Sequence, residues 1–427
     1  MLLNRKGEIC MLLEFSCSNH KSFKDKAVFS TIAGKDDTNE ELLYNFGNYR
    51  VLNSALIDGA NGSGKSNFID ALRFMKAMVV NSINYQPGKP VRQLPHKLLS
   101  INDDSTYFMQ FITKGVRYAF GFTLNQCLIK EEFLYVFPNG RQQKIYERLD
   151  EEIMPGDKYK GKFELCKSAL KPNRLVLSCA ANFSQIDEIM HVFSFFRDEL
   201  IIYTSGLANG SWMEYSLKSI CSNENIKENV LKLLQYFGTG IKDLSITFEE
   251  KPFKEEQLPL FLSEQAKLEI IKQNVMIVDA KVIYDQFQVD LLQEESQGIK
   301  KLIEFMCPFI DIILKGKVLI CDEIETSLHE SIVYKIFDYF RHSKIVSNSC
   351  PQMISTTHDT SLLNLDLFRR DQIWFTELKN NERSTDLYSL AEIKNVRKDE
   401  NIGKGYISGK YGAIPMLNES IASLIKD

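Results

Sequence analysis

Alternating hydrophobic and polar residues run through the N-terminal part of the chain, a pattern typical of strands that bury one face. The pattern starts near Met11, returns at residues 28–32, and recurs in three segments between residues 107 and 137. Because short turns separate these three segments, they predict an antiparallel meander. The apolar run at residues 51–57 predicts a buried strand, and a helical pattern starts at Lys65 after a glycine-containing loop.

Apolar residues take a helical spacing in the middle of the chain, at residues 186–200 and 226–237, which predicts an inserted helical lobe. Strands and helices then alternate at residues 317–321, 331–340, 353–356 and 372–376. This alternation predicts an α/β architecture. We therefore expect residues 11–180 and 291–427 to form one α/β domain that residues 181–290 interrupt. No heptad repeat continues long enough to predict a coiled-coil arm.

Composition narrows the class of protein. Hydrophobic residues make up 44% of the 427 residues and charged residues 25%, as in ordinary globular proteins. The 52 Lys and Arg residues against 56 Asp and Glu residues give a net charge of -4. Any contact with nucleic acid therefore needs a local basic patch.

Cysteine usage and apolar runs bear on the location of the protein. The nine cysteines include no C-x-x-C pair, which argues against a disulfide framework or a zinc ribbon and favours a reduced cytoplasm. Apolar runs such as residues 318–321 are far shorter than the roughly 20 residues that span a bilayer, so we expect no membrane partner. Because the strand pattern begins at Met11, either Met1 or Met11 is expected as the start.

The loop at residues 59–66 reads G-A-N-G-S-G-K-S and matches the phosphate-binding pattern G-x-x-x-x-G-K-[ST] at every position. Its glycines let backbone N–H groups turn toward phosphate, and the following helix adds its positive end. Lys65 would reach the β- and γ-phosphates, and the Ser66 hydroxyl would bind Mg²⁺. We therefore expect ATP and Mg²⁺ as ligands. The expected nucleotide-binding residues are Asn61, Gly62, Ser63, Gly64, Lys65, Ser66 and Asn67.

Two later strands end in candidate catalytic groups. One ends in Asp322 and Glu323, where Asp322 would hold Mg²⁺ and Glu323 would polarise the attacking water. Another is followed by His358, and a side chain at that end of such a sheet points into the nucleotide crevice. We expect His358 to sense the γ-phosphate. Each feature alone has a simpler interpretation, a solvated strand end for the acids and a helix-capping loop residue for the histidine.

A fourth motif precedes the Asp-Glu strand. Residues 295–300 read E-S-Q-G-I-K directly before a predicted helix at 300–309, with Ser296 at the N-cap. Because a helix N-terminus can bind an anion, Ser296 and Gly298 are further candidates for nucleotide contact. An ordinary N-cap would have the same sequence. The order along the chain favours the binding role: a phosphate loop, an insertion, a Ser-x-Gly helix start, an Asp-Glu strand and a His strand.

That order resembles the ATP-binding cassette (ABC) ATPases. Within them it resembles the SMC and Rad50 head domains and the related ATPases of bacterial abortive-infection and anti-phage systems, such as the RloA/AbiLi type and relatives of the overcoming-lysogenisation (OLD) nucleases. Residues 59–66 look like the Walker A motif, Asp322 and Glu323 like the Walker B pair, and residues 324–329 like the D-loop. His358 looks like the switch histidine, and residues 296–298 are similar to a shortened signature motif that departs from Leu-Ser-Gly-Gly.

Both ends of the chain extend this resemblance. Residues 15–25 and 406–415 are similar to the opening and closing motifs of the abortive-infection group, with Lys21 where arginine is usual. The implied fold is α/β, a P-loop NTPase of the ABC-ATPase head type, with a mixed sheet, an antiparallel meander and an inserted helical lobe. Glu323 and His358 would be catalytic, and Ser66 and Asp322 would bind the metal. Gln86 and Gln93 are the candidates for the Q-loop glutamine.

The resemblance also implies a function and partners. The protein would hydrolyse ATP, form a homodimer or higher oligomer on ATP, and control an effector protein, typically a TOPRIM-type nuclease, in anti-phage defence. A phage protein or nucleic acid would be the trigger. This chain is not expected to be the nuclease itself, because only 69 residues follow His358 and a TOPRIM domain needs about a hundred.

Two alternatives stay open. The first is an SMC- or Rad50-like ATPase that acts in DNA repair or chromosome handling; the lack of heptads and the near-neutral charge count against it. The second is an ATP-binding scaffold whose hydrolysis is incidental.

Cations and tyrosines interleave near the C-terminus, which would suit a surface for nucleic acid or effector, but nearby acids favour a solvated loop. The residues concerned are Lys394, Arg397, Lys398, Lys404, Tyr406, Lys410 and Tyr411, with Glu392, Asp399 and Glu400.

Overall fold

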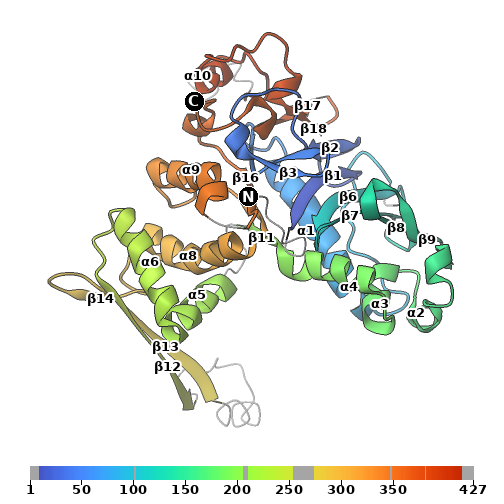
Figure 1. Ribbon diagram of the computed structural model, residues 1–427, viewed down its shortest axis with the longest axis horizontal. Helices are drawn as coiled ribbons and strands as arrows, with labels where there is room; N and C mark the ends of the chain where they lie inside the picture. Colours follow the sequence, from blue (N-terminus) through green and yellow to red (C-terminus); the bar gives the residue numbers. More distant parts are fainter. Residues whose placement is uncertain are drawn as a thin grey trace, which may run out of the picture. The chain divides into compact units, whose positions relative to one another are not determined.

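The computed structural model describes residues 9–100, 102–204, 210–252, 274–346, 349–379 and 381–415 (Figure 1). Met1 lies outside the described residues. The chain divides into two compact units. The first contains Met1–Ser205, Ile312–Thr326 and Val333–Asp427, and the second contains Gly206–Asp311 and Ser327–Ile332.

The first unit contains a seven-stranded antiparallel sheet in the order β10-β9-β8-β7-β6-β1-β2. Alternate residues of β6, such as Met109 and Phe111, turn toward the core, and the Phe111 and Phe195 rings stack with centroids 4.1 Å apart. The predicted meander is confirmed, and it extends further at both edges. The strands are β1 Met11–Ser18, β2 Ala27–Ser30, β6 Ser105–Thr113, β7 Val116–Leu124, β8 Ile129–Phe137, β9 Gln143–Leu149 and β10 Glu152–Pro155.

A six-stranded sheet in the order β11-β15-β16-β5-β17-β18 lies in the same unit. Its first five strands are parallel to their neighbours, and only β18 is antiparallel to β17. The carboxyl ends of β5, β15 and β16 therefore share one edge. The strands are β5 Ser54–Asp58, β11 Leu200–Thr204, β15 Val318–Asp322, β16 Gln352–Thr356, β17 Ile373–Lys379 and β18 Ser384–Ser389.

The apolar run predicted as one strand at residues 51–57 is divided. Its first part belongs to β4 Tyr49–Leu52, which pairs with β3 Leu43–Phe46 in a two-stranded sheet, and β5 begins at Ser54. The split has a physical reason: the buried polar residue Asn53 lies between the two strands and donates from Nδ2 to the Phe340 carbonyl oxygen at 2.6 Å.

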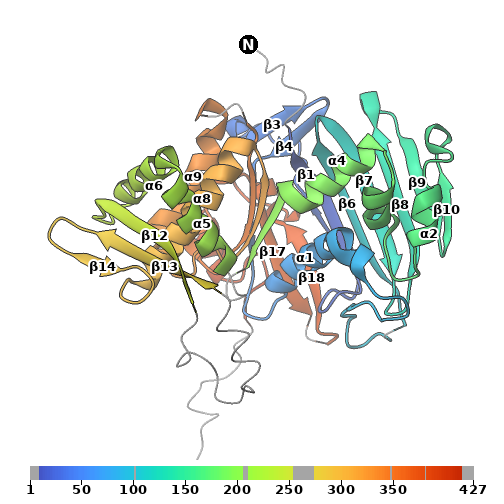
Figure 2. The same cartoon turned by 90° about the horizontal axis from the view of Figure 1, so that it is seen from below.

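Helix α1 Lys65–Asn81 lies beside β1 and β6, as Figure 2 also shows. Its buried Phe68 contacts Phe15 of β1 edge-on at 5.6 Å, and Phe74 lies 4.9 Å from Tyr107 of β6. Burying one such ring contributes about 2 kcal/mol, so this packing fixes the start of α1. The other helices of this unit are α2 Glu164–Ala169, α3 Val176–Phe183, α4 Asp187–Ser194 with the π-helical turn Phe195–Glu199, and α10 Ile402–Ile407; α9 Glu330–Val346 begins in the second unit.

The second unit combines helices with a small sheet. Helix α6 Glu224–Tyr236 corresponds to the helical pattern at residues 226–237, and α5 Gly210–Ser222 precedes it without a pattern having been identified there. The Asn223 side chain caps α6 by accepting the Ile226 N–H at 3.3 Å. The three-stranded antiparallel sheet was not predicted; it consists of β12 Asp243–Pro252, β13 Asn274–Ile283 and β14 Gln288–Asp290. Helix α8 Gln297–Lys315 begins in this unit.

The limits expected for the inserted lobe, residues 181–290, stay a prediction. Within the described ranges, no helix is both long and apolar enough to cross a bilayer.

Candidate nucleotide-binding site

The phosphate-binding loop connects β5 to α1, at the shared carboxyl edge of the parallel strands. Gly62 and Gly64 have φ angles of +77° and +119°, a backbone region that side chains disfavour. A Cβ at Gly64 would overlap the Thr385 side chain, and a Cβ at Gly59 would overlap the Thr376 carbonyl oxygen. The loop can therefore lie close to β17 and β18 only because glycines occupy these positions.

Hydroxyl groups from other elements hold the loop in place. The Thr385 Oγ1 donates to the Ser63 carbonyl oxygen at 2.7 Å, and the Ser63 and Thr376 hydroxyl oxygens lie 2.6 Å apart. The Asn67 Nδ2 donates to the Ser22 Oγ at 2.8 Å. The turn after β1 and the strands β17 and β18 thus pre-organise the loop, while Asn61 and Gly62 at its tip are exposed.

Lys65 is buried at the first position of α1, with 5% of its surface exposed. Its Nζ donates to the Gly59 carbonyl oxygen and lies 3.2 Å from the His358 Nδ1. Burial lowers the pKa of Lys65, and the surrounding carboxylates oppose this effect. These carboxylates are Asp58, Glu323, Glu325 and Asp322.

The two predicted metal ligands come together. Asp322 ends β15, and its Oδ1 accepts from the Thr356 Oγ1 at 2.6 Å and from the Ser66 Oγ at 3.4 Å. Hydroxyl and carboxylate oxygens are ligands that suit Mg²⁺, which keeps phosphate and water as its other ligands. Among the described residues, this site included, no group of three or more His, Cys, Asp or Glu side chains could hold a metal ion by itself. The residues present therefore fit a Mg²⁺ ion shared with a nucleotide.

Glu323 and His358 face each other across the ends of β15 and β16. The Glu323 Oε1 lies 3.4 Å from the His358 Nε2, and the side chains are 35% and 37% exposed, so water can reach them. Glu323 has φ +49°, which costs about 1 kcal/mol for a residue with a side chain. Hydrogen bonds hold this geometry: the Glu323 N–H donates to Thr356 Oγ1 at 2.8 Å, and the His358 N–H donates to Glu325 Oε1 at 2.6 Å.

Ser296 and Gly298 belong to the second unit. Ser296 is the N-cap of α8, as predicted, because its Oγ accepts the Ile299 N–H at 3.3 Å. A Cβ at Gly298 would lie 3.0 Å from the Ser327 carbonyl oxygen. Their contact with nucleotide stays a prediction.

The Q-loop assignment also stays a prediction. Gln93 is buried and donates from Nε2 to the Ser105 Oγ at 2.5 Å, a bond that anchors the segment before β6. Gln86 is exposed.

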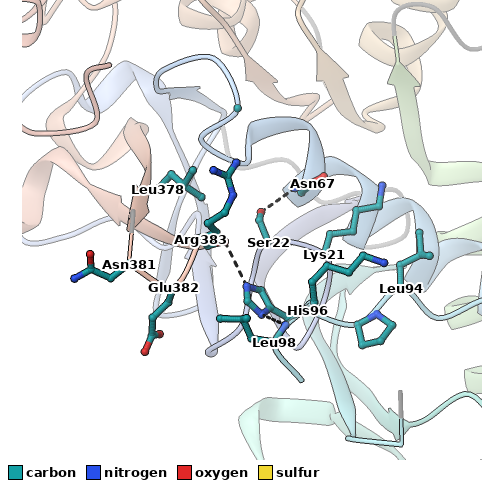
Figure 3. A pocket seen from close by; sticks show the side chains of 13 residues that line it. Lys21, Ser22, Asn67, Leu94, His96, Leu98, Leu378, Asn381, Glu382 and Arg383 are labelled. Carbon is teal, nitrogen blue, oxygen red and sulfur yellow. Dashed lines mark hydrogen bonds between the residues drawn. The ribbon is translucent and has the colours of Figure 1, made fainter. Parts of the chain in front are cut away.

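A cavity of about 720 Å³ opens beside the phosphate loop (Figure 3). Gly62 and Asn67 line it next to the loop, and Leu94, Leu98 and Leu378 give it apolar walls. Figure 3 shows His96 between these walls. The His96 Nδ1 accepts the Leu98 N–H at 3.2 Å, so its Nε2 carries the proton toward the Arg383 carbonyl oxygen at 3.3 Å. This bond joins the two loops that form the cavity.

Lys21 places a cation at the rim of this cavity. Its Nζ lies 2.6 Å from Asp70 Oδ2, and the buried His20 lies 3.1 Å from the same carboxylate. Burial alone would raise the pKa of Asp70. Hydrogen bonds from His20, Lys21 and Arg73 outweigh this effect and lower the pKa well below its usual value. An ionised Asp70 thus holds Lys21 in position.

The closing motif packs against the phosphate loop. The Ala60 N–H donates to the Ala413 carbonyl oxygen at 3.0 Å, and the Phe375 ring stacks on Tyr406 at 5.5 Å and on Tyr411 at 6.1 Å. With only 6% and 3% of their surfaces exposed, the two tyrosines cannot stack on nucleic-acid bases. The hypothesis that these tyrosines form part of a binding surface is therefore wrong, because their rings belong to the core.

Part of the chain matches a known family model. Residues 54–158 match a family model described as "AAA domain, putative AbiEii toxin, Type IV TA system". A search of curated proteins finds no match.

Solved structures that the chain resembles are SMC head domains. The SMC head domain from Thermotoga maritima has a TM-score of 0.40 and 11% identity, and the alignment covers 88% of this chain and 98% of that one. An SmcHead bound to the C-winged helix domain of ScpA has a TM-score of 0.43 and 14% identity, and the alignment covers 88% of this chain and 97% of that one. The Smc head domain bound to the C-terminal domain of ScpA from Pyrococcus furiosus has a TM-score of 0.40 and 13% identity, with 89% of this chain and 96% of that one covered.

The class of fold follows from the topology itself. A phosphate loop between a central parallel strand and a helix, acids at the end of a neighbouring strand, and an adjoining antiparallel sheet confirm the α/β P-loop NTPase fold of the ABC-ATPase head type.

Sequence reasoning missed several residues of this site. Thr356, Glu325, Thr385 and Asp58 each contact the predicted residues or their loop. For two of them the sequence holds a signal that could have identified them. Thr356 is a polar residue at the end of the strand before His358, and Asp58 is a charged residue that directly precedes the loop. Thr385 had none, because it is distant in sequence.

Proposed function

We propose that the protein binds ATP with Mg²⁺ and hydrolyses it to ADP and phosphate. The observation that carries this proposal is a continuous chain of contacts from the phosphate loop to the two strand ends. Lys65 reaches His358, His358 reaches Glu323, and Ser66 reaches Asp322. Five side chains from three separate segments converge as hydrolysis of a phosphoanhydride requires.

The cavity beside the loop suits the nucleoside of this nucleotide. Its volume of about 720 Å³ lies in the range of small-molecule sites. The apolar side chains of Leu94, Leu98 and Leu378 offer surface to a base, and Asn67 and Gly62 connect the cavity to the phosphate loop. The base would therefore lie between the loop before β6 and the β17–β18 turn.

Each residue has a part in the chemistry. When bound by Ser66 and Asp322, Mg²⁺ would neutralise charge on the β- and γ-phosphates. Lys65 would pair with the same phosphates. Glu323 would accept a proton from water as the water oxygen bonds to the γ-phosphorus and the bond to the ADP oxygen breaks. His358, held by the bond from its N–H to Glu325, would contact the γ-phosphate and orient Glu323.

The test is phosphate release from Mg²⁺–ATP by the purified full-length chain, with and without double-stranded DNA. We expect hydrolysis that requires Mg²⁺ and does not depend on DNA. Turnover that requires DNA would favour the SMC- or Rad50-like alternative. Binding of ATP without any turnover would leave the scaffold interpretation, and the absence of binding would contradict the proposal.

We further propose that this cytoplasmic ATPase dimerises on ATP and controls an effector protein in anti-phage defence. Two observations support it: the similarity of residues 15–25 and 406–415 to motifs of the abortive-infection group, and the family match at residues 54–158 whose description names a Type IV TA system. Light scattering with and without the non-hydrolysable analogue AMP-PNP tests dimerisation. Copurification with the product of the neighbouring gene tests for an effector, of which a TOPRIM-type nuclease is one type.

A further inference from the structure

Asp58 is a buried carboxylate at the base of the phosphate loop. It ends β5, directly before Gly59, and only 1% of its surface is exposed. Its Oδ1 accepts the Gly59 N–H at 2.5 Å. Its Oδ2 is buried and has no hydrogen-bond partner among the described residues. A buried anionic oxygen without a partner is costly, and a proton on that oxygen removes the charge.

Charged and titratable groups interact with Asp58 from four segments of the chain. They are Lys65 of α1, Glu325 after β15, Asp359 after β16 and Tyr406 of α10. From β17, the uncharged Thr376 hydroxyl lies 3.4 Å from the main-chain oxygen of Asp58. Of these charged groups only Lys65 is positive, so the Gly59 N–H and Lys65 are the groups that favour the ionised form of Asp58.

The balance between these groups is close. Burial raises the pKa of Asp58 to about 7, with the help of the Glu325 and Asp359 carboxylates and against the Gly59 hydrogen bond and Lys65. Lys65 and Asp58 bind opposite ends of the same residue, since Lys65 donates to the Gly59 carbonyl oxygen and Asp58 accepts the Gly59 N–H. Whatever engages Lys65 therefore changes the field at Asp58.

We propose that Asp58 is a positioning residue of the phosphate loop, and that its carboxylate takes up a proton from solvent when a nucleoside triphosphate binds. The proton goes to Oδ2, while Oδ1 keeps the Gly59 bond. This inference rests on the proposed function, because it assumes that phosphate pairs with Lys65. A neutral Asp58 leaves the Lys65 charge to the nucleotide, whereas an ionised Asp58 competes for it.

The sign of the pH dependence follows by linkage. Phosphate adds negative charge and engages Lys65, so it raises the pKa of Asp58 above its value of about 7 in the free protein. Binding then takes up as much as one proton at pH values between the free and the bound pKa. Affinity should fall as pH rises through this window, by as much as about tenfold per pH unit.

Calorimetry with Mg²⁺–AMP-PNP between pH 6.5 and 8.5, in buffers with different ionisation enthalpies, tests the proposal. The wild type should bind more weakly above pH 7 and take up protons on binding. Asp58→Asn keeps an oxygen for the Gly59 N–H and cannot ionise, so its affinity should match the wild type at pH 6.5 and stay constant at higher pH. If Asp58→Asn fails to fold, Asp58→Ser is measured instead, with the same expected profile.

Two further variants identify the source of the effect. Glu377→Gln removes another carboxylate nearby, which accepts the Ala413 N–H at 3.2 Å, and it should keep the wild-type profile. Because the His358 Nδ1 lies 3.2 Å from the Lys65 Nζ, His358→Gln tests whether His358 causes the effect, and its affinity should still fall as pH rises. A wild type with no proton uptake, a neutral Asp58 variant with the wild-type slope, or a flat profile in His358→Gln would overturn the proposal. If the wild type fails to bind at pH 6.5, the proposed nucleotide function fails instead.

Discussion

Lys65 links the phosphate loop to His358, because its ammonium group contacts both the Gly59 carbonyl oxygen and the His358 ring. We expect Lys65→Ala to weaken Mg²⁺–AMP-PNP binding by about 100-fold or more, since two charge-assisted hydrogen bonds to phosphate are lost and each contributes about 1.5–3 kcal/mol. Calorimetry measures this loss. Lys167→Ala is the matched control, because Lys167 is an exposed cation of α2 that pairs with Glu164 at 2.9 Å. Unchanged affinity in Lys65→Ala would contradict the Walker A assignment.

Glu323 should separate binding from chemistry. Glu323→Gln leaves Asp322 and Ser66 to hold Mg²⁺, so ATP should bind with wild-type affinity. The amide cannot accept a proton from water, and we expect turnover to fall by about 10² to 10⁴-fold. Single-turnover phosphate release gives the rate. If the variant hydrolyses ATP at the wild-type rate, another residue is the base.

At the residue scale, the sequence was sufficient to nominate candidate site residues wherever a motif lies within one segment. Lys65, Ser66 and the Asp322–Glu323 pair follow from short motifs next to predicted strands. It was insufficient where a residue acts across the sheet. Thr356 and Thr385 are ordinary threonines until folding brings them to Asp322 and Ser63, and no local pattern encodes that proximity.

At the scale of elements, Glu132 joins two strands of the meander to helix α3. This buried carboxylate of β8 accepts the Val176 and Leu177 N–H groups at 2.6 and 2.9 Å and the Tyr146 hydroxyl at 2.6 Å, and it lies 3.7 Å from the buried Arg148. Glu132→Ala would leave the buried Arg148 cation without a carboxylate partner and the first N–H groups of α3 without an acceptor. We expect a loss of about 3–5 kcal/mol in the free energy of unfolding.

Urea unfolding followed by circular dichroism measures this change. Glu131→Ala is the control. Glu131 is next to Glu132 in β8, but its side chain is exposed on the opposite face, so its removal should lower the free energy of unfolding by less than about 0.5 kcal/mol. Equal stability of the two variants would show that the Glu132 network is dispensable.

Helices and strands could be predicted where a hydrophobic period within the segment itself indicates them. The 3.6-residue period identified α6 and α9, and the two-residue period identified β6, β7 and β8. The sheet of β12, β13 and β14 was missed, because strands of a hairpin are stabilised by partners distant in sequence. Asp243 pairs with Ile283, for example, across a connection of 21 residues between β12 and β13, and the neighbouring helical patterns dominated the local signal.

At the scale of the whole molecule, the proposed dimer predicts a site shared between subunits. The first N–H groups of the helix that begins after Ser296 have no acceptor within the helix itself, and the resemblance to ABC ATPases assigns them to the nucleotide of the partner. If so, Lys65→Ala and Ser296→Arg are each inactive alone, since every site then lacks one half. A heterodimer of the two variants keeps one site with wild-type residues on both sides.

Mixing the two variants should therefore restore ATP hydrolysis. With random exchange, roughly a quarter of sites would be intact, and fewer would act if turnover needs both sites, because a symmetric dimer shares each site between its subunits. Two affinity tags verify that heterodimers form. Asn223→Arg makes the same kind of change at the N-cap of α6 and should leave hydrolysis intact, which separates a lost helix cap from a lost nucleotide contact. A mixture that contains heterodimers but is no more active than its parents would reduce Ser296 to the helix cap that its bond to Ile299 already makes it.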